Sequence, residues 1–149
     1  MGRTWIFLLM GLLAGAVAPV QAGVNAQLRH FSGQAVWTAL ASFTIGTLTL
    51  LTYFLVARLP WPETSSLGRA PWWAWLGGLL GAYYVLSAVV IAPRLGAAVL
   101  IALIIAGQLI VALGLDHFGL VGYQQHPVNL ARVVGALFLL TGVVLIQRY

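Results

Sequence analysis

Few side chains in this sequence could do chemistry, and most of those that could lie inside or beside long apolar stretches. Gln21, Asn25 and Gln108 carry amide groups within such stretches. Hydrocarbon cannot satisfy an amide, so each of them must pair with another helix, with water or with a ligand. These three amides, with Tyr84 as an aromatic wall, are candidates for binding a small polar molecule. Hydrogen bonds that only hold helices together are the alternative.

Four ionisable residues near the ends of the apolar stretches are candidates for charge recognition or coupling: Arg29, Arg94, Asp116 and His117. The arginines can extend to lipid headgroups, or favour an anionic group if either faces a transport path. Asp116 can cap loop amides, pair with an arginine, or carry a proton together with His117. Arg94 and Asp116 flank one predicted helix about 33 Å apart, so they could meet only between two antiparallel copies.

No set of residues has the spacing of a catalytic or metal site. The chain has two acidic residues, Glu63 and Asp116, no cysteine, and three histidines that form no metal-binding pattern. It also lacks a Gly-x-Ser-x-Gly nucleophile motif and a phosphate-binding loop. We therefore expect no enzyme activity, no metal site and no cofactor.

The composition predicts a membrane protein. Of 149 residues, 62% are hydrophobic and 6% are charged, which is too little polar surface for a water-soluble domain of this size. The formal net charge of +5 comes from seven scattered arginines, whereas nucleic-acid binding needs basic residues gathered on one face. We therefore expect the lipid bilayer as a partner and no nucleic acid.

Five apolar windows in the sequence have the length of about 20 residues that crossing a bilayer requires. They predict a single all-α transmembrane domain over residues 1–149, with helices at about 4–28, 35–57, 72–92, 93–115 and 127–146. Pro93 and Pro127 are placed in first helical turns, where the missing N–H costs nothing. Pro19 lies inside the first window, where it should kink or unwind the helix.

Residues 1–22 also have the features of a secretory signal. Arg3 precedes an apolar core, and the small residue Ala22 stands at a candidate cleavage point. A secreted protein should be mostly soluble after cleavage, yet the apolar windows continue to the end of the chain. We therefore expect no cleaved signal peptide and assign this stretch to the first membrane helix.

The arginines are shared almost evenly between the two sides of the membrane. Five helices place the termini on opposite sides, which sorts the arginines into four on the N-terminal side, Arg3, Arg58, Arg69 and Arg132, and three on the other, Arg29, Arg94 and Arg148. The positive-inside rule needs an excess on one side, so either orientation should insert. Two oppositely inserted copies would form an antiparallel dimer that reproduces an inverted-repeat transporter. A fixed orientation set by the translocation machinery or a second protein is the alternative.

Each predicted helix also carries a face of small or weakly polar residues when plotted at about 100° per residue. Small residues let membrane helices approach closely. The glycines assigned to helix or dimer packing are Gly11, Gly15, Gly77, Gly81, Gly107, Gly114, Gly135 and Gly142. Such faces predict a compact bundle around an interior path.

Several segments, in order along nearly the whole chain, together resemble the five-helix YdcZ branch of the drug/metabolite transporter superfamily: PVQAGVNAQLR, WLGGLLGAYYV, APRLGAA, AGQL, LDHFGL and GALFLLTGVVLI. In that family the Gln-Ala-Gly-x-Asn-x-x-Leu pattern closes the first transmembrane helix. The resemblance therefore implies interior positions for Gln21, Gly23, Asn25 and Leu28. It also implies a multi-pass protein of the bacterial inner membrane that assembles in pairs equivalent to ten-helix relatives.

These observations predict an exporter-like secondary transporter that moves a small polar metabolite by alternating access in an inverted dimer. The dimer would be a homodimer or a heterodimer with a paralogue. The alternative is a non-transporting membrane subunit whose glycines and polar groups serve assembly. The first helix contains no acidic residue, in contrast to the small multidrug branch, so proton exchange at a central carboxylate is not implied.

Overall fold

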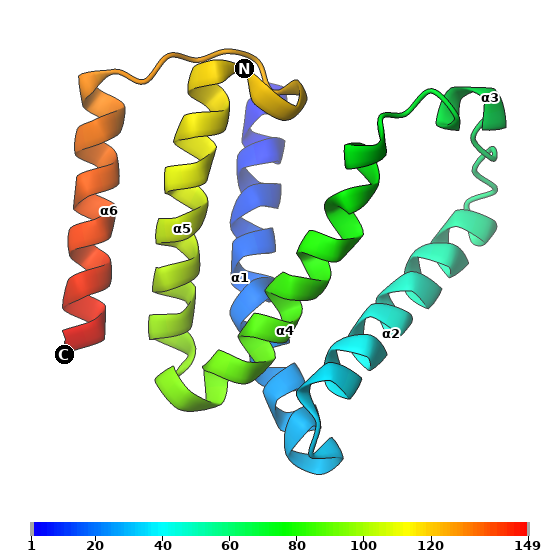
Figure 1. The fold of residues 1–149 in the computed structure, drawn as a ribbon, viewed down its shortest axis with the longest axis horizontal. Coiled ribbons are helices and arrows are strands. Elements are labelled where there is room, and N and C mark those ends of the chain that lie inside the picture. The colour runs from blue at the N-terminus through cyan, green and yellow to red at the C-terminus, as the bar shows by residue number, and fades with distance from the viewer. Residues whose placement is uncertain (1, 149) are drawn as a thin grey trace. The chain divides into compact units, whose positions relative to one another are not determined.

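The computed structural model describes residues 2–148, and the side chains described are those of residues 4–148, so the side chain of Arg3 lies outside them. The helices are α1 (Gly2–Ser32), α2 (Ala35–Val56), α3 (Thr64–Leu67), α4 (Gly77–Leu95), α5 (Ala97–Phe118) and α6 (Leu130–Arg148), with 3₁₀ turns η1 (Trp72–Leu76) and η2 (Leu120–Gly122) (Figure 1). Within the described residues, five helical segments are long and apolar enough to cross a membrane: α1, α2, η1 with α4, α5 and α6. The predicted all-α chain with five apolar helices is therefore confirmed.

The chain divides into two compact units, Met1–Pro93 and Arg94–Tyr149. In the first unit, α1 and α2 are joined by a tight turn at Gly33, whose φ of +72° favours glycine. Helices α2 and α4 share a buried apolar cluster that consists of Ala39, Val85 and Val89 and is extended by Ala35, Tyr84 and Leu86. Close packing of these side chains joins α2 to α4, as van der Waals contact does between membrane helices.

The second unit is a helical hairpin in which α5 and α6 run side by side in opposite directions (Figure 1). Gly119 ends α5 in the left-handed conformation, with φ of +62°. Ala102, Ala106 and Val143 are buried together, and Leu140 packs against them. Two of these residues are alanines, and their small side chains allow the backbones of α5 and α6 to approach closely.

Pro93 does not begin the fourth span, so that prediction is wrong. It lies in the last turn of α4, which continues to Leu95, and the next span begins at Ala97. Gly96 separates the two helices with φ of +80°, a conformation that side chains disfavour. The φ of a proline suits a last helical turn as well as a first one, and the only bond lost is the one to the carbonyl of Val89.

Pro127 does not begin the last span either, because α6 starts at Leu130. The Oδ1 atom of Asn129 accepts the backbone N–H of Arg132 at 2.9 Å, as a capping asparagine does at a helix N-terminus. The side chain of Asn129 therefore caps the start of α6, and Pro127 lies in the loop before it.

Pro19 does not unwind the first helix, because α1 is helical from Gly2 to Ser32. Proline removes one donor from the helical ladder, and membrane helices tolerate this loss when neighbouring bonds persist. Ala22, the candidate cleavage point, lies within this helix and is only 5% exposed. The small side chain at this position is therefore used for packing in the folded chain.

The spans bury few of their residues against one another. In the most apolar window of each span, the buried share ranges from 0% in α6 to 17% in α4 and α5. The outward side chains are mainly leucine, isoleucine, valine and aromatic residues, including Leu12, Leu50 and Phe138. Such surfaces require lipid or a further protein as their surroundings, so the bilayer is the partner of this chain.

Candidate functional site

A polar corner lies in the first unit, where the end of α1 meets α2 and α4. We define the α1 corner as Asn25, Arg29, Ser32, Thr38 and the carbonyl group of Val89. Among the residues whose side chains are described, Asn25 and Thr38 are the two buried polar ones, with exposures of 5% and 0%. Buried polar groups are costly in an apolar protein, so their partners decide what this corner does.

Arg29 supplies a donor that the backbone of α4 lacks. Its Nη1 atom donates to the carbonyl oxygen of Val89 at 3.1 Å. In a regular helix this carbonyl would accept the N–H of the residue four positions later, which is Pro93 and has no N–H. Val89 is 0% exposed, so its carbonyl cannot use water instead. The Arg29 guanidinium therefore satisfies the carbonyl that Pro93 leaves without its helical partner.

Hydroxyl groups hold the backbone of the α1 corner in place. The hydroxyls of Ser32 and Thr38 lie 3.0 Å apart, and Thr38 donates to the carbonyl of Gln34 at 2.9 Å. The N–H of Gln34 donates to the Ser32 hydroxyl at 3.3 Å, and the N–H of Gly33 donates to the Arg29 carbonyl at 2.9 Å. These bonds fix the turn after Arg29, and they thereby hold the end of α1 from which the Arg29 side chain extends.

Asn25 lies one helical turn before Arg29, so both side chains occupy the same face of α1. Within the described residues, the side-chain amide of Asn25 has no hydrogen-bond partner. Asn25 is nevertheless buried, with only 5% of the residue exposed. No fully covered polar side-chain atom of the described residues lacks a partner, so the amide atoms of Asn25 are not fully covered by the chain.

The other predicted binding residues occupy different surroundings. Gln21 is exposed on α1, Tyr84 is half-buried against the apolar cluster of α4, and Gln108 is exposed on α5 in the second unit. No hydrogen bond in the described residues joins these three side chains to Asn25. Helix α1 therefore places Asn25 and Arg29 on one face, and the binding role of all four predicted residues stays a prediction.

The loop between α5 and α6 is fastened by a second polar cluster. Arg132 Nη1 lies 3.2 Å from Asp116 Oδ2 and donates to the carbonyl of His126 at 3.1 Å. The N–H of His126 donates to the Asp116 carbonyl at 2.7 Å, and the N–H of Val128 donates to His117 Nδ1 at 3.0 Å. Asp116 and His117 thus both hold the loop, each through a partner of the same chain.

Arg132 was counted among the arginines of the N-terminal side but was not one of the predicted site residues. Asp116 ends one span and Arg132 begins the next, so the two flank one connection on one side of the membrane. That arrangement was the available signal for an ion pair. Arg94, which was paired with Asp116 between two predicted copies, is an exposed residue in the last turn of α4.

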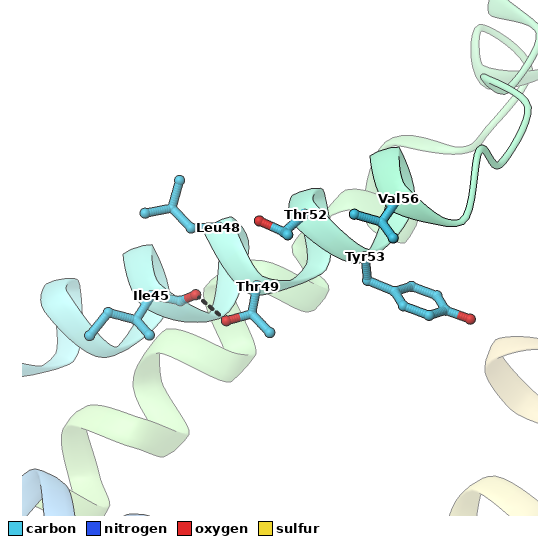
Figure 2. Close-up of a pocket in the computed structure, with 6 residues that line it drawn as sticks. All are labelled: Ile45, Leu48, Thr49, Thr52, Tyr53 and Val56. Atoms are coloured by element: carbon cyan, nitrogen blue, oxygen red, sulfur yellow. Dashed lines mark hydrogen bonds between the residues drawn. The ribbon is translucent and has the colours of Figure 1, made fainter.

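One hollow in the described surface is open and mostly apolar and lies along α2 alone. Its volume is about 520 Å³, and Figure 2 shows the residues that line it: Ile45, Leu48, Thr49, Thr52, Tyr53 and Val56. The Thr49 hydroxyl donates to the carbonyl of Ile45 at 2.8 Å within the same helix (Figure 2). Because one helix contributes every wall residue, this hollow does not enclose a ligand by itself.

The predicted packing glycines are open on the single chain, with one exception. A Cβ atom built at Gly81 would lie 3.3 Å from the ring of Phe43, so α2 and α4 meet there. At the other seven, Gly11, Gly15, Gly77, Gly107, Gly114, Gly135 and Gly142, an added Cβ would meet no described atom within 4 Å. Their role in contacts with another chain stays a prediction.

The comparisons with known proteins find similarity to inner membrane proteins. Residues 6–145 match the family described as "Putative inner membrane exporter, YdcZ". Over 81 residues the chain is 36% identical to the inner membrane protein YdcZ of Escherichia coli strain K12. This match covers 52% of the present chain and 51% of the E. coli protein. The chain therefore matches about half the length of this curated relative, and no solved structure matches it. Because the family match covers most of its length, the chain belongs to the YdcZ family of inner membrane proteins.

Proposed function

We propose that this protein is a secondary carrier that exports a small polar metabolite by alternating access in a pair of oppositely inserted chains. The description of its family supports export, which is a transport activity and not catalysis. Five apolar helical segments in the described residues supply the membrane-spanning framework that a carrier requires. The substrate and the mechanism are the parts that this proposal adds.

The observation that carries the proposal is the Asn25 amide. It is 95% buried on a membrane-spanning helix, has no hydrogen-bond partner in the described chain and lies one turn from Arg29. An amide that served only to hold helices together would be expected to bond across them, as Arg29 does to Val89. A polar solute that accepts or donates hydrogen bonds would satisfy this group.

The paired arrangement follows from the charges and the open surfaces. The predicted four-to-three sharing of the arginines between the membrane sides permits both orientations. Seven of the eight predicted packing glycines have no described atom within 4 Å of an added Cβ, so their faces can accept a second chain. An inverted pair would supply the symmetry that alternating access uses in transporters built from inverted repeats.

The same open glycines favour the second candidate function, a membrane subunit that assembles with another protein and moves no solute. The two functions differ in the role of Asn25. In a carrier the amide contacts the solute, whereas in an assembly subunit it completes a contact between chains.

The test is reconstitution of the purified chain into liposomes, with solute flux and dimer content measured on the same preparation. Asn25→Ala should abolish flux while the dimer persists. Gln27→Ala is the matched control, because it removes an exposed amide from the same helix and should leave flux unchanged. If Asn25→Ala separates the dimer and no solute moves even with the unmodified chain, the carrier is excluded and the assembly subunit is supported.

A further inference from the structure

We infer that the α1 corner binds a small carboxylate, held by the Arg29 guanidinium and the Asn25 amide together. This inference rests on the proposed carrier function for its biological use, but it concerns a site that binding measurements can test separately. It assigns the chemical class of the ligand, a monoanion with hydrogen-bonding oxygens.

The charge of Arg29 has no acidic partner in the described chain. Asp116 lies 3.2 Å from Arg132, and the remaining acid, Glu63, accepts a hydrogen bond from Ser65 at 3.5 Å. Arg29 is half-buried, and its side chain is a guanidinium cation. A positive group that is partly withdrawn from water and contacts no carboxylate has a strong electrostatic preference for an anion.

The guanidinium also has donors to spare. A guanidinium carries five N–H groups, and the Val89 carbonyl takes one of them, at Nη1. That contact anchors the group and leaves other N–H donors for a ligand. Two parallel N–H groups of arginine match the two oxygens of a carboxylate, and such bidentate pairs are among the strongest hydrogen bonds in proteins.

Asn25 provides the second contact. It lies one turn from Arg29 on the same face of α1, and its amide has no partner in the described chain. The amide can donate to a carboxylate oxygen that Arg29 also holds, or bond a hydroxyl group elsewhere in the ligand. One unpaired cation balances one negative charge, so the corner suits a monocarboxylate better than a phosphate dianion.

The other arginines with a proposed or observed role offer less favourable sites. Arg132 already pairs with Asp116, and Arg94 is exposed, so bulk water weakens its attraction for an anion. Arg29 combines partial burial, spare donors and an adjacent unpartnered amide. These three properties do not occur together at Arg94 or Arg132.

The binding test compares carboxylates with their neutral amides. The full-length protein in detergent would be titrated with acetate, lactate and benzoate, each beside acetamide, lactamide and benzamide, at constant ionic strength, with thermal stabilisation as the readout. At least one carboxylate should stabilise the protein while its amide does not. Arg29→Gln should weaken that carboxylate by about tenfold or more, since a charge-assisted hydrogen bond is worth more than 1.4 kcal/mol. Arg69→Gln, which removes an equal charge from the exposed loop, should have no effect.

Two further variants keep the test decisive. Arg29→Gln also leaves the Val89 carbonyl without its donor, so it is repeated together with Pro93→Ala, which restores a backbone N–H to that carbonyl. Asn25→Asp places a carboxylate one turn before Arg29, in the favourable order for an ion pair on a helix. This internal anion should raise the unfolding temperature and abolish binding of added carboxylates.

The outcomes separate this inference from the carrier proposal. Equal stabilisation by acids and amides, stabilisation by none of the three acids, or binding that survives Arg29→Gln in the Pro93→Ala background would each overturn the inference. Transport of neutral solutes alone would overturn it and leave the carrier intact. Carboxylate binding that depends on Arg29, without flux of the bound acid in liposomes, would support the site and exclude the carrier.

Discussion

The guanidinium of Arg29 lies 3.1 Å from the carbonyl oxygen of Val89, the carbonyl that Pro93 deprives of its helical donor. The two residues belong to α1 and α4 and are 60 positions apart in the sequence. This bond joins two helices through a defect in one of them, and it anchors the charge that we assign to ligand binding.

The first prediction concerns the stability of this bond. Arg29→Gln should lower the free energy of unfolding by about 1–3 kcal/mol, because the buried Val89 carbonyl loses its donor. The loss should be clearly smaller in a Pro93→Ala background, where the N–H of residue 93 can take its place. Denaturant unfolding of the four proteins in detergent gives the coupling between the two positions. An equal loss in both backgrounds would show that Arg29 does not act through the Val89 carbonyl.

The second prediction concerns the Asp116 and Arg132 pair. Both side chains are about one-third exposed, at 31% and 34%, so solvent screens their attraction. Asp116→Asn should therefore destabilise the protein by no more than about 1 kcal/mol and leave the proposed dimer intact. Unfolding measurements and size analysis in detergent test this together. Dissociation of the dimer would mean that Asp116 acts between chains, as the pairing with Arg94 would require.

The third prediction concerns the open glycine face of α1. Gly15→Ile should preserve the helical content of the chain, because an added Cβ at Gly15 meets no described atom within 4 Å. If this face packs against a second chain, the larger side chain should weaken the dimer by about tenfold or more, through an overpacking cost of about 1–3 kcal/mol. Ala16→Ile is the control, since this exposed position lies about 100° around the helix. Dimerisation unchanged by Gly15→Ile would exclude this face from the interface.

The fourth prediction concerns orientation in the membrane. In this cysteine-free chain, a single Gln124→Cys label in the loop before α6 should react from both sides of the membrane. Replacing Ser65 and Ser66 with arginine should retain that loop in the cytoplasm, because it adds positive charge to the same side. Arg58→Gln with Arg69→Gln should shift the population toward the opposite orientation. Labelling from one side in all three proteins would establish a fixed topology instead.

Much of the fold could be predicted because a bilayer imposes simple requirements on a sequence. Long uncharged runs have to become helices when no water is present to satisfy their backbone, so the five spans could be read from residue types alone. Helix ends were harder to predict, because proline is compatible with the first turn of a helix and, as at Pro93, with the last. The φ of Gly96 and the capping bond of Asn129 decided those ends.

Residue type alone also singled out Asn25, since an amide in an apolar run is costly wherever its helix faces. What only the tertiary structure decided is which groups lie beside which. Arg29 approaches Val89 and Asp116 approaches Arg132 because packing brings separate helices together. Hydrogen bonds and ion pairs act over a few ångströms, whereas composition and periodicity report only the surroundings of each helix. The sequence therefore determined that this protein is a membrane protein and that Asn25 and Arg29 lie one helical turn apart, and the packing of its helices decided that Arg29 bonds to Val89 and that Asp116 pairs with Arg132.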